Sequence, residues 1–467
     1  MISEQYPQKI RPRAFHEANA LHTSFFGEPL SSSTTAQTPR PRRAKNERMC
    51  MGGHRDPIYG TAFSPDGKYL ATASEDSTVR IWLVQSHKLV ATLSEGMDTN
   101  YECLRVAWMK TTHDNSSTTP PQDDDAGGVD KYVLASAGAD GVVRLWSAVE
   151  TEEQKLEWQC VGSLNHFMEE EEERPQIYAL QFIQSPSYPN VDIMLTSAHD
   201  SVYLWTIESN DEESSSESPN TMMPRKFLSF LSIQFSHLDD VAQTYQFGGP
   251  RNPENELYVF DASYNESNDL LAAALSDGTC RVLSLAPSND DEDENTQREQ
   301  CVLSLPPGYF GDRGGHLTAV EWDSSGTRLA TCIASGRVIL WYLENVGIGK
   351  SISLRPSVVS ILDGGSGRQI FGAKYCCGKN EDLLLTWGVE GKVSVWDSYS
   401  VGEVMSPICT LISHTDYPIF SLDITQTGAK RSIAIGGGKD GGFVGVAAYL
   451  YDIAILSFDK PSSYPDT

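Results

Sequence analysis

Residues 54–82 read HRDPIYGTAFSPDGKYLATASEDSTVRIW, and this stretch decides the fold. The apolar run 58–63 ends at the turn Ser64-Pro65-Asp66-Gly67, where proline fixes φ and glycine accepts a positive φ. Residues 69–74 alternate, a second tight turn follows at 75–77, and 79–83 and 88–93 supply two further strands. Four short antiparallel strands make one small sheet, which cannot bury both of its faces alone.

The same pattern recurs along most of the chain. The later units are KYVLASAGADGVVRLW (131–146), DIMLTSAHDSVYLW (192–205), LLAAALSDGTCRVL (270–283), TRLATCIASGRVILW (327–341), EDLLLTWGVEGKVSVWD (381–397) and a looser unit over 419–452 with Tyr451 at the Trp position. Their spacing is irregular, but each excess coincides with an acidic or Pro/Ser/Gly-rich insert. Such loop insertions cost little free energy.

These units resemble the WD-repeat (Trp-Asp, WD40-type) β-propeller family, from about residue 48 to residue 458. The resemblance implies an all-β fold: a seven-bladed propeller of four-stranded antiparallel blades with acidic loop inserts. Residues 1–47 are expected to form a largely disordered arm with a basic cluster and a short helical segment, and 459–467 a C-terminal tail.

Two forms of ring closure are open. In one, residues 48–51, directly before Gly52-Gly53-His54, supply the outer strand of the last blade and join the chain ends. In the other, residues 454–458 supply that strand. The first form is favoured because it matches the staggered closure that the resemblance implies.

The family carries a structural hydrogen-bond network of a His, a Ser/Thr, an Asp and a Trp in each complete blade. In unit one the resemblance places it on His54, Ser74, Asp76 and Trp82. Elsewhere it is incomplete. Unit two keeps Asp140 and Trp146 but has Gly138 at the Ser position. Unit three keeps His166, Asp200 and Trp205. Units five and six keep Trp341 and Trp396 but have Ser335 and Glu390, respectively, at the Asp position. Unit four lacks the Trp. Blades four and seven are therefore expected to be the least stable.

His54, Ser74 and Asp76 include the residue types of a hydrolase triad. The resemblance instead implies that they are buried between blades and lock a turn, so no catalytic residue is predicted and the protein is not expected to be an enzyme.

The formal net charge is −27, and four acidic clusters (123–125, 169–173, 208–217 and 290–294) account for much of it. Such dense like charge is typical of solvated loops. An acidic body disfavours binding to nucleic-acid phosphates, and no nucleic-acid module is recognisable. No apolar run is long enough for a transmembrane helix, and the N-terminus lacks a signal-peptide pattern.

Nine cysteines are scattered without a C-x-x-C motif, and no His pair has zinc spacing, so no metal site and no cofactor are predicted. This usage suits reduced thiols in a cytoplasmic and/or nuclear protein. The basic stretch 39–48 is either a nuclear localisation signal or a basic arm, and residues 15–30, at roughly helical spacing, dock either on a partner or on the propeller itself.

One acidic cluster is the candidate partner-binding site. Five consecutive carboxylates precede the third blade and would lie on the rim where the chain enters each blade, called the top rim here: Glu169, Glu170, Glu171, Glu172 and Glu173. The hypothesis is that this rim attracts a Lys/Arg-rich peptide or tail. The alternative is that the glutamates form only a solvated loop.

The family resemblance implies a non-catalytic scaffold or recognition subunit of a multiprotein complex. The alternative is a substrate receptor of a ubiquitin ligase, but the Trp-Asp-x-Arg box of that group is missing, since Trp396-Asp397 is followed by Ser398-Tyr399. The identity of the partner and the oligomeric state do not follow from the sequence.

Overall fold

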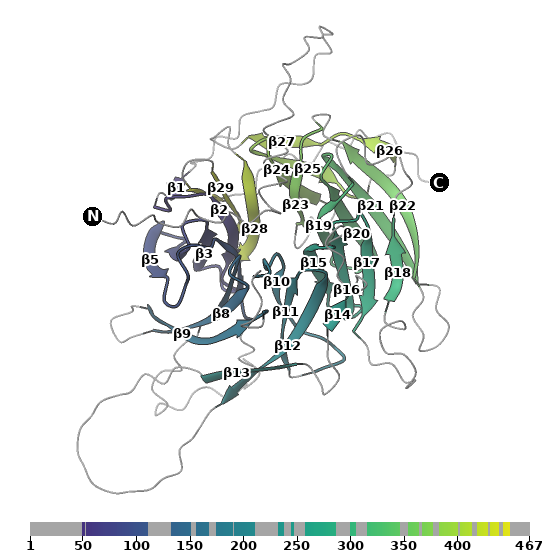
Figure 1. The fold of residues 1–467 in the computed structure, drawn as a ribbon. Coiled ribbons are helices and arrows are strands. Elements are labelled where there is room, and N and C mark those ends of the chain that lie inside the picture. The colour runs from purple at the N-terminus through teal and green to yellow at the C-terminus, as the bar shows by residue number, and fades with distance from the viewer. Residues whose placement is uncertain are drawn as a thin grey trace, which may run out of the picture.

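The computed structural model consists of β-strands and the turns that join them (Figure 1). It describes residues 49–51, 53–110, 132–150, 156–167, 174–189, 191–210, 232–237, 244–246, 257–285, 299–304, 315–345, 354–363, 367–376, 383–399, 402–412, 418–427, 430–438 and 442–448.

The first sheet contains β2 (Ile58–Phe63), β3 (Tyr69–Ser74), β4 (Val79–Leu83) and β5 (Lys88–Leu93), paired antiparallel in that order. These bounds confirm the four strands predicted from the sequence. Gly67 has φ +69°, and the Ser64 hydroxyl donates to Asp66 and accepts the Tyr69 N–H, which fixes the turn between β2 and β3.

The described strands form six further sheets. The second sheet is β6 (Cys103–Trp108), β7 (Tyr132–Gly138), β8 (Val142–Glu150) and β9 (Leu156–Asn165). The third is β10 (Leu180–Ile183), β11 (Asp192–Ala198), β12 (Ser201–Asn210) and β13 (Ser232–His237), and β14 (Thr244–Gln246) also pairs with β12. The fourth is β15 (Val259–Asn265), β16 (Leu270–Leu275), β17 (Cys280–Ser284) and β18 (Glu299–Leu303).

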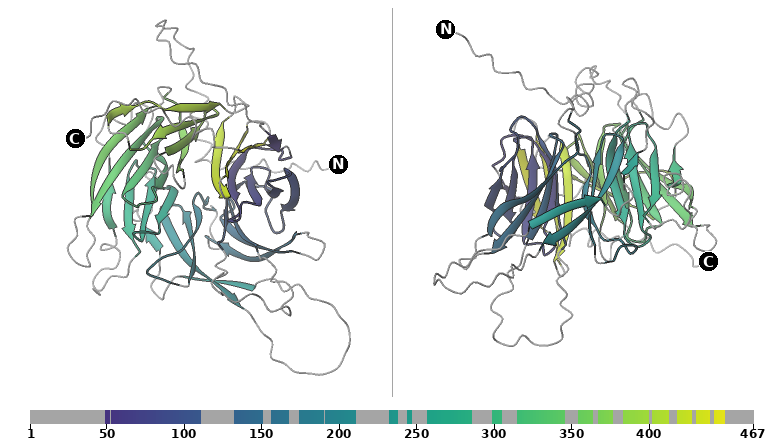
Figure 2. Two further views of the ribbon diagram at one scale, coloured as in Figure 1. Left: turned by 180° about the vertical axis from the view of Figure 1, so that it is seen from behind. Right: turned by 60° about the horizontal axis from the view of Figure 1, so that its bottom comes forward.

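The fifth sheet is β19 (Leu317–Trp322), β20 (Arg328–Ile333), β21 (Arg337–Asn345), β22 (Leu354–Asp363) and β26 (Gly402–Met405). The sixth is β23 (Ile370–Tyr375), β24 (Leu383–Gly388), β25 (Lys392–Asp397) and β27 (Cys409–Ile412). The seventh is β28 (Ile419–Thr427), β29 (Lys430–Gly438), β30 (Gly442–Ala448) and β1 (Met49–Met51). Figure 1 and the reverse view in Figure 2 show the sheets set around a common centre with their first strands innermost. The architecture is an all-β propeller.

The two ends of the repeat array meet in the seventh sheet. β1 pairs antiparallel with β30 in the register Met49↔Val446, Cys50↔Gly445 and Met51↔Val444. The favoured closure is therefore confirmed. Residues 454–458, the alternative closing strand, lie outside the described residues, as do residues 1–47 and 459–467, so the predicted arm and tail are untested.

Apolar cores lie between neighbouring sheets. Ile81 of the first sheet packs with Leu134 and Trp146 of the second, and Trp82 and Ile58 on the other face pack with Ala434 of the seventh. Full burial of a side chain such as Ile81 contributes about 2 kcal/mol to folding. Since each sheet covers a face of the next, closing the ring leaves no sheet with two exposed faces.

Two strands depart from the predicted plan of four strands per unit. β26 pairs parallel with β22 of the preceding sheet, and the following segment, β27, becomes the outer strand of the sixth sheet. The edge of β22 offers unpaired backbone groups to the nearby chain, and β26 satisfies some of them.

Candidate functional site

A buried hydrogen-bond network links the loop before β2 to β3 and β4. His54 Nδ1 lies 2.9 Å from Asp76 Oδ2, His54 Nε2 lies 2.8 Å from Thr72 Oγ1, and Trp82 Nε1 donates to Thr72 Oγ1 at 2.9 Å. With His54 protonated on Nδ1, the Thr72 hydroxyl donates to His54 Nε2. Every polar side-chain group of this network then has a hydrogen-bond partner. Such a network fixes one conformation of the turn.

The Asp76 carboxylate anchors this network. Burial by itself would raise the pKa of Asp76, but hydrogen bonds from His54, Thr78 and the Arg55 N–H hold that pKa well below its ordinary value. Asp76 is therefore ionised throughout the neutral range and binds the turn as an acceptor.

The hydroxyl member of the network was predicted wrongly. Ser74 does not join it: the Ser74 hydroxyl donates to the Asp56 carbonyl oxygen at 2.9 Å and accepts the Asp76 N–H at 3.2 Å. Trp82 pairs with Leu70 across the two strands, so its indole reaches Thr72, two residues along the same face. Ser74 lies about 7 Å further along β3 and out of reach.

The same hydroxyl–indole pair occurs in four other sheets. In each, the indole of the Trp donates to a Ser or Thr hydroxyl at the position equivalent to Thr72, with distances of 2.8–2.9 Å: Trp146 to Ser136, Trp205 to Thr196, Trp341 to Thr331 and Trp396 to Thr386. The signal in the sequence is a Ser or Thr nine or ten residues before each Trp. The interpretation of Gly138 as a lost hydroxyl was wrong, because Ser136 holds that role.

The remaining predicted network residues also lie between strands. Asp140 is paired with Arg144 at 2.8 Å and accepts the Val142 N–H. His166 Nε2 lies 2.7 Å from Thr196 Oγ1, and Asp200 accepts the Ser201 hydroxyl at 3.0 Å. A Cβ on residue 138 would lie 2.8 Å from Asp140 Oδ1, which explains the glycine there.

A cavity of about 440 Å³ occupies the centre of the ring and is lined by the innermost strand of every sheet. His54, Ser74 and Asp76 do not line it, so the residues that resemble a triad do not face this space. The side chains that do line it include two cations and three carboxylates, from five sheets: Arg105, Asp261, Glu321, Lys374 and Asp423.

These channel charges hold neighbouring sheets together. Lys374 Nζ lies 2.7 Å from Asp423 Oδ1, Asp423 Oδ2 accepts the Phe63 N–H at 2.7 Å, and Asp261 Oδ2 accepts the Val320 N–H at 3.0 Å. Burial raises the pKa of Asp261 to about 6 and of Glu321 to about 7. The channel thus contains carboxyl groups that titrate near neutral pH.

Aromatic side chains surround the top end of this channel, where the chain enters the innermost strands. Here they are called the mouth collar: Tyr59, Tyr178, Phe260, Phe371 and Phe420. Ring centroids lie 5.0 Å apart for Tyr59–Phe420, 5.1 Å for Phe371–Phe420 and 5.5 Å for Tyr178–Phe260.

The collar arises from a repeated backbone irregularity. Six of the described innermost strands shift register at their second residue, as between Ile58 and Gly60 or between Ile419 and Ser421. A β-bulge removes the extra residue from the ladder and re-aims its side chain. The residues so displaced include Tyr59 and Phe420, and the sequence analysis missed this set.

One side of the collar is acidic. The Tyr59 hydroxyl donates to Glu75 Oε2 at 2.9 Å. Burial, together with the nearby carboxylates Glu75, Glu102 and Asp56, raises the pKa of Tyr59 far above its ordinary value. Negative charge is therefore concentrated beside the collar on the first and second sheets.

The predicted partner-binding residues Glu169 to Glu173 lie outside the described residues, between Phe167 and Arg174. Arg174 itself lies over the rings of Tyr101 and Phe167 and 3.7 Å from Asp98. These contacts place Arg174 beside the top of the second sheet.

Among the described side chains, Cys103, Cys160, Cys280 and Cys332 are free thiols. In the same part of the chain, no group of His, Cys, Asp and Glu is arranged to hold a metal ion. Nor does a helix there have the length and apolar character needed to span a membrane.

Comparisons with known proteins agree with this architecture. Residues 45–82 match the family model described as WD domain, G-beta repeat. Similar proteins include a probable cytosolic iron-sulfur protein assembly protein 1 of Pyricularia oryzae, with 26% identity over 52% of this chain and 51% of the relative. The Polycomb protein EED of Chaetomium thermophilum is 30% identical over 33% of this chain and 24% of that protein. The F-box-like/WD repeat-containing protein TBL1X of Mus musculus is 60% identical over 31% of this chain and 25% of that protein.

The matched segments span about half of the first relative and about a quarter of the other two. The matched repeat covers the loop bearing His54 and the strands β2 to β4, and the same hydroxyl–indole pair recurs in four further sheets. The chain belongs to the WD40-repeat β-propeller family.

Proposed function

We propose that this protein is a non-catalytic interaction subunit of a multiprotein complex, built on a seven-bladed propeller whose blades are the seven sheets. On this proposal its top rim binds a Lys/Arg-rich segment of a partner protein. The mouth collar with its adjacent carboxylates carries the proposal, because it combines the two features that attract a cationic side chain.

The collar supplies aromatic faces. A lysine or arginine side chain over a Phe or Tyr ring gains about 0.5–2 kcal/mol, depending on how well it is desolvated. Phe260, Phe371 and Phe420 are only partly buried, so part of each ring remains accessible at the channel mouth.

The carboxylates supply charge. Asp56, Glu75 and Glu102 are partly exposed beside Tyr59, and the whole chain carries a net charge of −27. Such a surface steers basic segments toward the rim and speeds their association. Glu169 to Glu173 directly precede Arg174 in the sequence, and we include them in the proposed binding surface.

The relatives have different names, and each match covers only part of the relative, so they do not identify the partner. We place the protein in the cytoplasm, the nucleus or both, in keeping with its free thiols.

A peptide titration tests the proposal. A fluorescein-labelled peptide of alternating Gly and Lys/Arg should bind the wild-type chain, and Glu75→Gln combined with Glu102→Gln should weaken binding about tenfold. The amide oxygen introduced by Glu75→Gln can still accept the Tyr59 hydroxyl, so the collar keeps its shape. The matched control is Glu344→Gln, because Glu344 is exposed near the far end of β21.

Equal affinity of the double variant and the Glu344→Gln control would contradict the proposed rim. A separate variant with all five residues of 169–173 changed to Gln measures the contribution of these residues to the affinity for the peptide. Loss of affinity only in that variant would move the site from the collar to the acidic stretch.

A further inference from the structure

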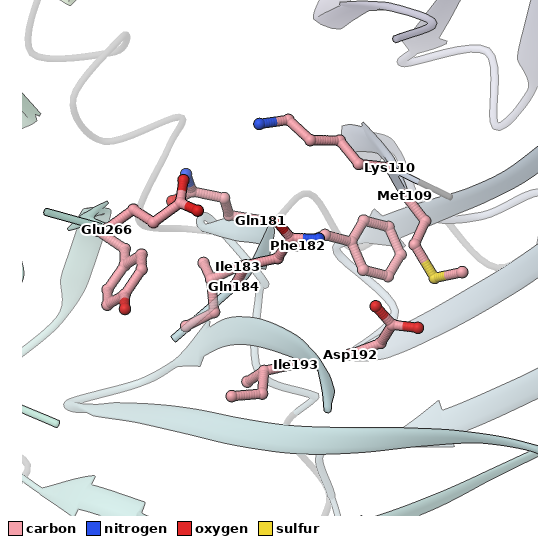
Figure 3. Close-up of a pocket in the computed structure, with 10 residues that line it drawn as sticks. Met109, Lys110, Gln181, Phe182, Ile183, Gln184, Asp192, Ile193 and Glu266 are labelled. Atoms are coloured by element: carbon pink, nitrogen blue, oxygen red, sulfur yellow. The ribbon is translucent and has the colours of Figure 1, made fainter. Parts of the chain in front are cut away.

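A second pocket lies at the opposite end of the channel wall, where β6 and β10 end and β11 begins (Figure 3). Its apolar part is formed by Met109, Phe182, Ile183 and Ile193, of which Ile183 and Ile193 are almost fully buried. Its volume is about 90 Å³, which is room for a few water molecules.

Polar side chains from three sheets border this pocket on two sides: Asp192 lies on the side of Phe182 and Met109, and Gln181 and Glu266 lie on the other side (Figure 3). Asp192 comes from β11, Gln181 and Gln184 from β10 and the residue after it, and Glu266 from the turn after β15. Lys110 follows β6 and is exposed, and in Figure 3 its ammonium group points away from Asp192. The three charged residues Asp192, Glu266 and Lys110 give the pocket a net charge of −1.

Asp192 is the distinctive group. It is partly buried, and its carboxylate makes no hydrogen bond or ion pair with another described residue. Burial raises its pKa, with no opposing donor or cation. A carboxylate removed from water is costly unless a donor or cation replaces the lost hydration. The pocket therefore offers a half-buried carboxylate with which a cationic group can pair.

The surroundings of Asp192 favour one type of cation. In Figure 3 its carboxylate lies beside the ring of Phe182 and the thioether of Met109. A guanidinium is planar and weakly hydrated, so it stacks on an aromatic face and donates two parallel hydrogen bonds to a carboxylate. An ammonium is compact and strongly hydrated and does neither as well.

We propose that this pocket binds the guanidinium group of an arginine side chain on a partner protein. The guanidinium pairs with Asp192 and lies against Phe182, because these two side chains lie on the same face of the third sheet, beside Met109. The pocket has space for one guanidinium group but not for a peptide backbone, which stays outside. This site is separate from the mouth collar.

Binding of short peptides to the full chain tests this site. Acetyl-Gly-Arg-Gly-amide, its lysine analogue and its citrulline analogue are titrated separately, and binding is followed by ligand-observed NMR. Citrulline has the shape of arginine without its charge. The arginine peptide should bind saturably, the lysine peptide several-fold more weakly, and the citrulline peptide at least tenfold more weakly.

Three variants locate the binding. Asp192→Asn should weaken the arginine peptide at least tenfold, and Phe182→Leu several-fold. Glu157→Gln, on the outer strand β9, should have no effect. Because Asp192 has no partner among the described residues, Asp192→Asn should melt no lower than the wild type, which separates lost binding from lost folding.

Several results would overturn the assignment. These are no saturable binding, equal affinity for arginine and citrulline, and unchanged affinity in Asp192→Asn. Tighter binding of free arginine than of the peptide would overturn the assignment to a protein side chain. Glu75→Gln with Glu102→Gln should leave this site intact, so failure of the top-rim proposal and failure of this one give different results.

Discussion

At the scale of single residues, Thr72 is the most consequential side chain of the first sheet. Its hydroxyl serves both His54 and Trp82, and Thr72→Val would leave two buried nitrogen atoms without a partner. Each such loss costs about 1–3 kcal/mol, so the free energy of unfolding should fall by about 2–6 kcal/mol. Urea denaturation measures this change.

Thr61→Val is the matched control. The Thr61 hydroxyl is buried in the same sheet with no hydrogen-bond partner among the described residues, so its replacement should be neutral or stabilising. If the two variants lost the same stability, the network would not be a stabilising element.

The bounds of the strands near these residues could be predicted from the sequence, whereas the side-chain hydrogen bonds between them could not. Alternation and turn residues predicted β2 to β5 to the residue. Thr72 and Ser74 point to the same face of β3, because side chains repeat every second residue. Alternation cannot distinguish them. Only the reach of the Trp82 indole across the strand pair does.

At the scale of elements, the closing strand β1 should contribute measurably to stability. Its pairing with β30 adds a few backbone hydrogen bonds, worth roughly 1 kcal/mol each, and covers the open edge of the seventh sheet. Removing residues 1–52 should therefore cost about 2 kcal/mol and lower the melting temperature. Removing residues 1–47 alone leaves β1 in place and should change the melting temperature little. Equal melting of both truncations would argue against this closure.

The closing strand was predictable because the two ends of a repeat array carry unpaired strand edges, and few segments of the chain can join them. β26 was not, because its residues carry no repeat pattern and its pairing with β22 depends on an edge that is created only when the fifth sheet forms. The mouth collar was likewise hidden, since a bulge is a property of strand pairing and not of local composition.

At the scale of the whole molecule, the repeat pattern predicted the propeller, but the contents of the channel required the folded ring. Four of the charged channel residues come from four different sheets: Arg105, Asp261, Glu321 and Lys374. In the sequence, Arg105 and Asp261 are more than 150 residues apart, and each later pair of neighbours in this series is more than 50 residues apart. No local motif connects them. By contrast, Asp192 and Phe182 belong to the paired strands β11 and β10 of one sheet, and only Met109 joins them from another sheet.

The channel makes stability depend on pH. Glu321 has a pKa of about 7 in the folded chain against 4.5 for an ordinary glutamate, and Asp261 about 6 against 3.8. The folded state therefore holds more protons than the unfolded state between about pH 4 and 7, so these two groups make stability fall as pH rises through that window. Glu321→Gln replaces the carboxyl with a group that stays neutral. It should melt higher than the wild type at pH 8 and equally at pH 4, whereas the exposed control Glu344→Gln should match the wild type at both. Other groups, including His316, add their own pH dependence to both proteins, but that contribution cancels in the difference between variant and wild type. A Glu321→Gln variant that melts no higher than the wild type at pH 8 would show that the Glu321 carboxylate is well solvated or well paired in the channel.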